Sequence, residues 1–287
     1  MEREVSFSSD GLTLSGLMGL PDKGNAPHPA IIVMHGFGGH KDGPQQRWSA
    51  PFYRAMGYAT LRFDFRGCGE SEGPRGRVVP NEEIADAIAA FRFLAGQDEI
   101  DASRVALSGT SYGATVAVAA ASREPGVAAV IAQGGWGNGE RMFRHLHATP
   151  ESWEKFSQLL AEGRSQRQAG EEPMMVHRYD LIPVPERLRG NIDPRSIFDF
   201  SIETGIETFD FNTEDEVASM AGRPLLLVHS AGDDVIHPEG SYDLFAAAQQ
   251  PADLQIVSGV DHFMFGEDDM RVAHMIEDWL GRYFPVD

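Results

Sequence analysis

The chain has 287 residues, of which 42% are hydrophobic and 23% charged, and this balance excludes a disordered or fibrous protein. Its formal net charge of −19 repels phosphate backbones and anionic lipids, so we expect neither a nucleic-acid partner nor a membrane surface. The single cysteine, Cys68, excludes an intramolecular disulfide and a multi-cysteine metal site. Because the chain shows no basic, apolar leader and no apolar run of membrane-spanning length, we expect a cytoplasmic protein.

The first part of the chain alternates strand and helix patterns. Residues 4–8 and 12–20 alternate around the turn Ser9-Asp10-Gly11 and predict an antiparallel hairpin. Four short, mostly apolar runs predict strands buried on both faces of a sheet: 30–34, 59–63, 105–108 and 127–133. Helical patterns separate them, at 46–56, 82–94 and 114–122. This alternation predicts an α/β fold with a mostly parallel, doubly wound sheet.

The pattern breaks between Trp136 and Met220. Prolines interrupt helical and irregular pieces there, and no strong strand pattern is found. Thr149 followed by Pro150 is typical of a helix start. The strand–helix alternation then resumes at 224–229, 239–249, 253–258 and 268–283. We therefore predict an α/β core formed by residues 1–135 and 220–287, with residues 136–219 inserted as a mainly helical cap.

Two segments match G-x-S-x-G, the pattern of a nucleophile elbow, and they are centred on Ser71 and Ser111. An elbow is a sharp turn from a buried strand into a helix, and small residues two positions before and after the serine relieve its crowding. Ser111 follows an apolar strand pattern and precedes a helix pattern, whereas prolines at 74 and 80 forbid a helix directly after Ser71. We therefore predict Ser111 as the nucleophile.

An acid and a histidine should follow on loops after later strands. His262 comes just after the strand 253–258, and Asp233 and Asp234 follow the strand 224–229. We prefer Asp233, because Asp234 opens the turn toward the next helix. No histidine pair has the spacing of a zinc-binding helix, so we predict no metal and no cofactor.

The negatively charged oxygen of a tetrahedral intermediate needs hydrogen-bond donors, which we predict to be two backbone amides. Tyr112 directly follows the nucleophile. Phe37 lies in the glycine-rich loop His35-Gly36-Phe37-Gly38-Gly39, where the glycines let an N–H group turn toward the serine.

That loop, the stretch 62–73, the elbow and residues 229–233 together resemble the α/β-hydrolase superfamily. Within it, the chain looks most like the cinnamoyl and feruloyl esterase branch, over residues 1–135 and 220–287. The resemblance implies a serine hydrolase that cleaves carboxylic esters through an acyl-enzyme. Cleavage of an amide, a thioester or a carbon–carbon bond with the same triad stays open, and so does a non-catalytic ligand-binding homologue.

The predicted cap is rich in aromatic and methionine side chains. If they line an acyl pocket, the substrates are small-molecule esters, or related acyl compounds, of bulky or aromatic acids. We expect five of them to contact substrate: Trp136, Met142, Phe143, Met174 and Phe198. The sequence leaves a homodimer open.

Overall fold

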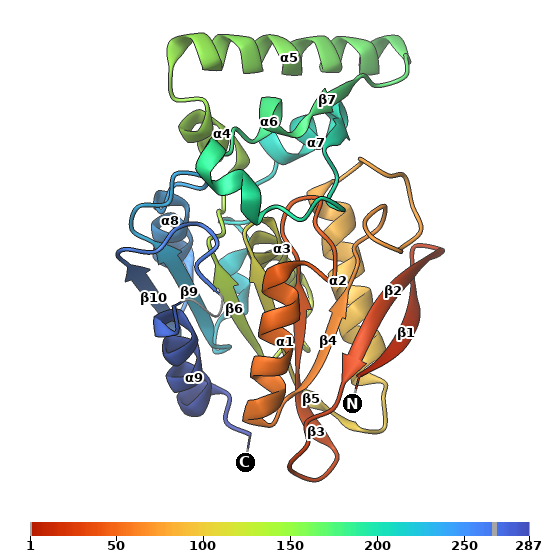
Figure 1. Ribbon diagram of the computed structural model, residues 1–287, viewed down its shortest axis with the longest axis vertical. Coiled ribbons are helices and arrows are strands. Elements are labelled where there is room, and N and C mark those ends of the chain that lie inside the picture. The colour runs from red at the N-terminus through yellow and green to blue at the C-terminus, as the bar shows by residue number, and fades with distance from the viewer. Residues whose placement is uncertain (1, 266–268, 287) are drawn as a thin grey trace.

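A computed structural model describes residues 2–265 and 269–286, and within them eight strands form one twisted sheet (Figure 1). The strand order is β1-β2-β4-β3-β5-β6-β9-β10. The strand bounds are β1 Glu2–Ser9, β2 Leu12–Gly19, β3 His28–Met34, β4 Ala59–Phe63, β5 Ile100–Thr110, β6 Ala129–Gln133, β9 Leu225–Ser230 and β10 Ala252–Val257. β1 pairs antiparallel with β2 and β2 with β4, and the remaining pairs are parallel. The predicted hairpin and parallel strands are therefore confirmed.

Helices cover both faces of this sheet, as a doubly wound fold requires. The bounds of these helices are α1 Pro44–Met56, α2 Pro80–Ala95, α3 Tyr112–Arg123, α8 Glu239–Ala247 and α9 Arg271–Tyr283. Side chains of β3 alternate between the two layers: Ile31 and Val33 belong to the core with α1 and α9, and Ile32 to the core with α2 and α3. Every residue of β3 and β4 is buried, so neither strand has a solvent-exposed face; most of their residues are apolar, and the polar residues of β4, Thr60 and Arg62, are buried as well.

The predicted start of the last helix, Asp268, lies outside the described residues, and α9 is described from Arg271. Among the described residues, no helix combines the length and the apolar character that crossing a membrane requires.

The chain between β6 and β9, here called the β6–β9 segment (residues 134–224), lies over the carboxyl ends of the parallel strands, with one long helix outermost (Figure 1). Its elements are α4 Gly139–Leu146, α5 Pro150–Ala169, β7 Met175–His177, α6 Arg178–Leu181, η1 Glu186–Asn191, β8 Asp199–Ser201, α7 Ile202–Phe209 and η2 Val217–Met220. Thr149 caps α5 as the sequence predicts, because its hydroxyl accepts the Ser152 N–H.

The sequence pattern shows no strand in this segment, but the structure pairs β7 with β8 in antiparallel register. The expectation failed because each strand has only three residues, too few for an alternating pattern. Tertiary contacts hold the pair in place: Val176 and Phe200 face each other in the ladder and both are buried.

Candidate active site

Ser111 sits at the sharp turn between β5 and α3, with a φ of 56° and a ψ of −123°. The glycines on either side permit this turn. A Cβ at Gly109 would lie 2.1 Å from the Gly113 carbonyl oxygen, and a Cβ at Gly113 would lie 2.4 Å from the carbonyl oxygen of His35. Since real side chains cannot approach this closely, both positions require glycine, and the strained turn presents Ser111 at the carboxyl edge of the sheet.

The three residues predicted as a triad lie in one hydrogen-bonded row. His262 Nε2 is 2.9 Å from Ser111 Oγ, and His262 Nδ1 is 2.7 Å from Asp233 Oδ2. A carboxylate only accepts, so Nδ1 carries the proton and donates it to Asp233, which leaves Nε2 free to accept from the serine hydroxyl. This is the tautomer that a general base beside serine needs.

The Asp233 carboxylate is fixed from several sides. Its Oδ1 accepts the backbone N–H groups of Val235 and Ile236, both at 2.9 Å, and His229 Nε2 lies 3.4 Å from Oδ2. Burial raises the pKa of Asp233, but the charge of His262 and the hydrogen bonds of His229 and His262 outweigh burial and hold that pKa below its ordinary value. The carboxylate is therefore ionised at neutral pH.

Asp234, the alternative acid, points elsewhere. Its side chain is 41% exposed and forms an ion pair with Arg187 of the β6–β9 segment. The second serine motif is likewise remote from the imidazole: Ser71 Oγ donates to the Asp64 carbonyl oxygen and accepts the Ser15 N–H. The geometry brings Ser111, Asp233 and His262 together, and it brings neither Asp234 nor Ser71 to them.

The two amides predicted as oxyanion donors flank Ser111. Tyr112 is the first residue of α3, so its N–H group has no acceptor within the helix. Phe37 lies in the loop after β3. Within the part of the chain that the structure describes, neither amide donates a hydrogen bond. The rings of Phe37 and Tyr112 contact each other, with centroids 5.6 Å apart, so the two backbone segments are packed together.

A cavity of about 100 Å³ opens beside Ser111 and His262. The Phe37 loop and the start of α1 form one wall, and residues of the β6–β9 segment between 178 and 196 form another. The lining includes several polar side chains: His40, Gln45, Gln46, Arg178, Asn191, Asp193 and Ser196. The site therefore combines an activated hydroxyl, unoccupied amide donors and a small, partly polar cavity.

Comparison with known proteins places this site in a family. The model of the X-Pro dipeptidyl-peptidase (S15) family matches residues 10–264, which is most of the chain. The chain belongs to this family. It is thus an α/β hydrolase, and the resemblance predicted from the sequence motifs is confirmed.

Three relatives illustrate the range of the superfamily. An uncharacterized 31.7 kDa protein of Escherichia coli is 27% identical over 96% of this chain and 97% of its own. GrgF of a Penicillium species, named a polyketide transferase, is 26% identical over 98% of this chain and 96% of its own. The solved structure of GrgF, 25% identical, covers 99% of both chains with a TM-score of 0.80. Est1E of Butyrivibrio proteoclasticus, solved with ferulic acid bound, has a TM-score of 0.72, is 17% identical and covers 97% of this chain and 98% of its own, which shows the shared fold.

None of the five residues predicted to contact substrate is among those that line the cavity beside Ser111. Trp136, Met142 and Phe143 are buried in the main apolar core, and Met174 packs against it. The ring centroid of Phe198 lies 5.7 Å from the Arg178 guanidinium carbon, but Phe198 is not on the cavity wall. Apolar composition alone could not separate the internal core of the β6–β9 segment from a substrate surface.

Arg178 is the cavity residue that sequence reasoning missed. It is 5% exposed, its Nε donates to the Ile197 carbonyl oxygen at 3.1 Å, and its Nη2 donates to the Phe37 carbonyl oxygen. Burial lowers its pKa to about 10, so it is still charged at neutral pH. No carboxylate of the described residues pairs with it. A lone arginine in an irregular stretch carries no sequence signal that would reveal this position.

Proposed function

We propose that the chain is a serine hydrolase that cleaves carboxylic esters through an acyl-enzyme on Ser111. The observation that carries this proposal is the row from Ser111 through His262 to Asp233, with two unoccupied backbone amides beside the nucleophile. A non-catalytic homologue would have no need to keep the strained serine and the correct histidine tautomer together.

Each step of the proposed reaction uses a specific group of the site. His262 Nε2 takes the proton of the Ser111 hydroxyl as the oxygen attacks the ester carbonyl, and Asp233 stabilises the resulting imidazolium. The amides of Phe37 and Tyr112 hold the oxyanion. His262 then returns the proton to the departing alcohol, and a water molecule, deprotonated by the same nitrogen, releases the acid and regenerates Ser111.

Acyl transfer is the second candidate. GrgF, similar to this chain over nearly its whole length, is named a polyketide transferase, and the same acyl-enzyme can pass its acyl group to an alcohol instead of water. The two outcomes differ only in the acceptor. Product analysis with and without added alcohols therefore separates them: free acid alone supports hydrolysis, whereas a dominant new ester supports transfer.

We further propose that the β6–β9 segment acts as a cap and selects short acyl groups that carry a carboxylate. A cavity of about 100 Å³ is much smaller than the roughly 300–1,000 Å³ of sites for drug-sized ligands, so it favours a short chain over an aromatic acid. Arg178 contributes the charge. Its guanidinium donates to two carbonyl oxygens and lies 5.3–5.7 Å from the ring centroids of Phe37, Phe198 and Phe200, but it has no anionic partner among the described residues. A substrate carboxylate would supply that anion.

A fluorophosphonate probe tests the catalytic part of this proposal. We expect one adduct on Ser111, located by mass spectrometry, and none in the Ser111→Ala variant. An adduct on Ser71, or turnover of aryl esters by Ser111→Ala equal to that of the wild type, would contradict the assignment.

A matched pair of substrates tests the selectivity. The aryl half-ester of succinic acid carries a carboxylate, and the aryl ester of butyric acid has the same length without it. We expect Arg178→Gln to lower kcat/KM for the half-ester by about tenfold or more relative to the butyrate, because a charge-assisted hydrogen bond contributes roughly 1.5–3 kcal/mol. Equal losses for both substrates would mean that Arg178 only supports the Phe37 loop.

A further inference from the structure

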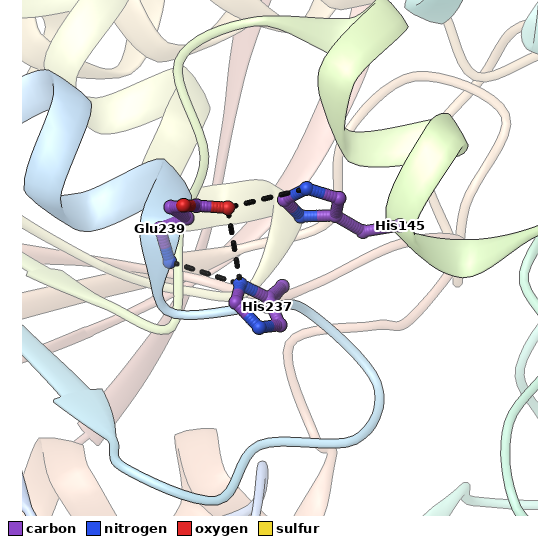
Figure 2. A group of neighbouring side chains, drawn as sticks. All are labelled: His145, His237 and Glu239. Carbon is purple, nitrogen blue, oxygen red and sulfur yellow. Dashed lines mark hydrogen bonds and ion pairs between the residues drawn. The ribbon is translucent and has the colours of Figure 1, made fainter. Parts of the chain in front are cut away.

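Two histidines and a glutamate lie close together outside the active site (Figure 2). All three line a second, small cavity between the β6–β9 segment and α8. His145 comes from the last turn of α4, His237 from the loop after β9, and Glu239 from the first residue of α8. Their potential ligand atoms all lie within 4.8 Å of one another. Sequence spacing predicted no metal, because it could not reveal a set assembled from distant parts of the chain.

The spacing suits a transition-metal ion. Glu239 Oε2 is 3.2 Å from His145 Nε2 and 3.7 Å from His237 Nδ1. Ligands about 2.0–2.2 Å from a tetrahedral zinc ion lie roughly 3.3–3.5 Å from each other, so the two distances to Glu239 bracket this value. In Figure 2 both imidazole rings turn a nitrogen toward the same carboxylate. His237 Nδ1 also accepts the backbone N–H of Glu239 at 3.4 Å, and a metal ion would take over this lone pair, so binding of the ion would replace that long hydrogen bond.

The charges around this cluster favour a cation. Three carboxylates line the same cavity, those of Glu239, Glu214 and Asp243, against one guanidinium, Arg141. Arg141 is itself engaged, because it pairs with both Glu214 and Asp243. A divalent ion at the cluster therefore meets a local excess of negative charge, in a chain whose net charge is −19.

We propose that His145, His237 and Glu239 form a zinc-type site for a divalent transition-metal ion, with three protein ligands and a position left for water. Two imidazoles and a carboxylate are the donors that zinc takes in such open sites. The ion would join α4 of the β6–β9 segment to the loop that carries Asp233, since His237 follows Ile236, whose N–H group holds the Asp233 carboxylate. It would thus fasten the segment over the cavity beside Ser111.

Zinc titration of the full-length, untagged, chelator-treated protein tests this proposal by calorimetry, with cobalt absorption as a report of the ligand geometry. We expect one ion per chain and a tetrahedral cobalt spectrum. His145→Ala, His237→Ala and Glu239→Gln should each weaken binding by about tenfold or more, since even changes outside the ligand set cost 10- to 100-fold. His274→Ala is the matched control, because His274 is an exposed histidine on α9, and it should bind zinc as the wild type does.

Two further readouts locate the ion and its effect. At a zinc concentration near the wild-type Kd, zinc should raise the unfolding temperature of the wild type and of His274→Ala clearly more than that of Glu239→Gln, because the stabilisation depends on the ratio of the ion concentration to the Kd. Loss of the stoichiometric binding in His262→Ala, with binding intact in His145→Ala, would place the ion at the triad and overturn the proposal. Absence of stoichiometric binding in the wild type, or equal weakening by His274→Ala, would overturn it as well.

Discussion

Ser111 holds a backbone conformation that a residue with a side chain rarely adopts, and among the described residues only Asp10 shares a positive φ without being glycine. Such a conformation costs on the order of 1–3 kcal/mol and persists where the surroundings over-determine it. Here the close backbone approaches at Gly109 and Gly113 fix the chain on either side of Ser111. The serine, its histidine and its acid could be predicted from the sequence because each has a fixed place relative to a strand pattern. Arg178 could not, since its contacts with the carbonyls of Phe37 and Ile197 exist only in the folded chain.

The two adjacent aspartates provide a test at this scale. We expect Asp233→Asn to lower kcat by about four orders of magnitude, because an amide in place of the carboxylate favours the wrong histidine tautomer. Asp234→Asn should leave kcat within a few-fold of the wild type, since Asp234 pairs with Arg187 at the surface. Steady-state kinetics with an aryl ester measure both. The opposite ranking would move the acid to Asp234.

Among the elements, the loop from His35 to Gly39 depends on a neutral histidine. His35 is buried, its Nδ1 donates to the Gly36 carbonyl oxygen at 2.9 Å, and its Nε2 accepts the Phe65 N–H at 3.2 Å. Burial is the largest cause that lowers the pKa of His35 to about 4. A second proton on Nε2 would face the Phe65 N–H, so protonation breaks the contact that ties the Phe37 loop to the chain after β4.

This histidine predicts a pH dependence of stability. The unfolded chain binds a proton at His35 below pH of about 6.5, whereas the folded chain does so only below about 4, so the free energy of unfolding falls as the pH drops through that window. The loss between pH 7 and pH 4.5 should be on the order of 2 kcal/mol. Urea unfolding at both pH values measures it. His35→Gln should show a smaller loss and His274→Gln the wild-type loss, and identical pH dependence in all three proteins would refute the role of His35.

Long elements were predictable and short ones were not. The strands β3 and β9 stand out because burial on both faces of the sheet favours apolar runs, here residues 30–34 and 225–228. The helix α5 stands out because Thr149 and Pro150 mark its start. β7, β8 and α6 span only three or four residues, and tertiary packing decides their structure. Of these short elements, α6 contributes Arg178 to the cavity wall, and most of the other wall residues of the β6–β9 segment lie in irregular stretches between β7 and β8, so the composition of the wall could not be inferred from periodicity.

At the scale of the whole molecule, the net charge of −19 and the buried cation Arg178 act on an anionic substrate in opposite directions. The overall charge repels an anion over a distance comparable to the Debye length, which shrinks from about 30 Å at 0.01 M salt to about 8 Å at 0.15 M. Arg178 acts at contact distance inside the cavity, where salt screens little. The two influences can therefore be separated by ionic strength.

We expect kcat/KM for the succinate half-ester to rise severalfold as sodium chloride increases from roughly 0.01 to 0.15 M, because screening reduces the work of bringing the anion to the cavity. The uncharged butyrate ester should respond weakly, and it serves as the control for salt effects on the protein itself. Arg178→Gln should lower kcat/KM for the half-ester at every salt concentration while keeping the same rise, since the long-range field changes little when one of many charges is lost. A fall in kcat/KM for the half-ester with added salt would show that the field at the cavity mouth is positive, and would contradict the dominance of the net charge.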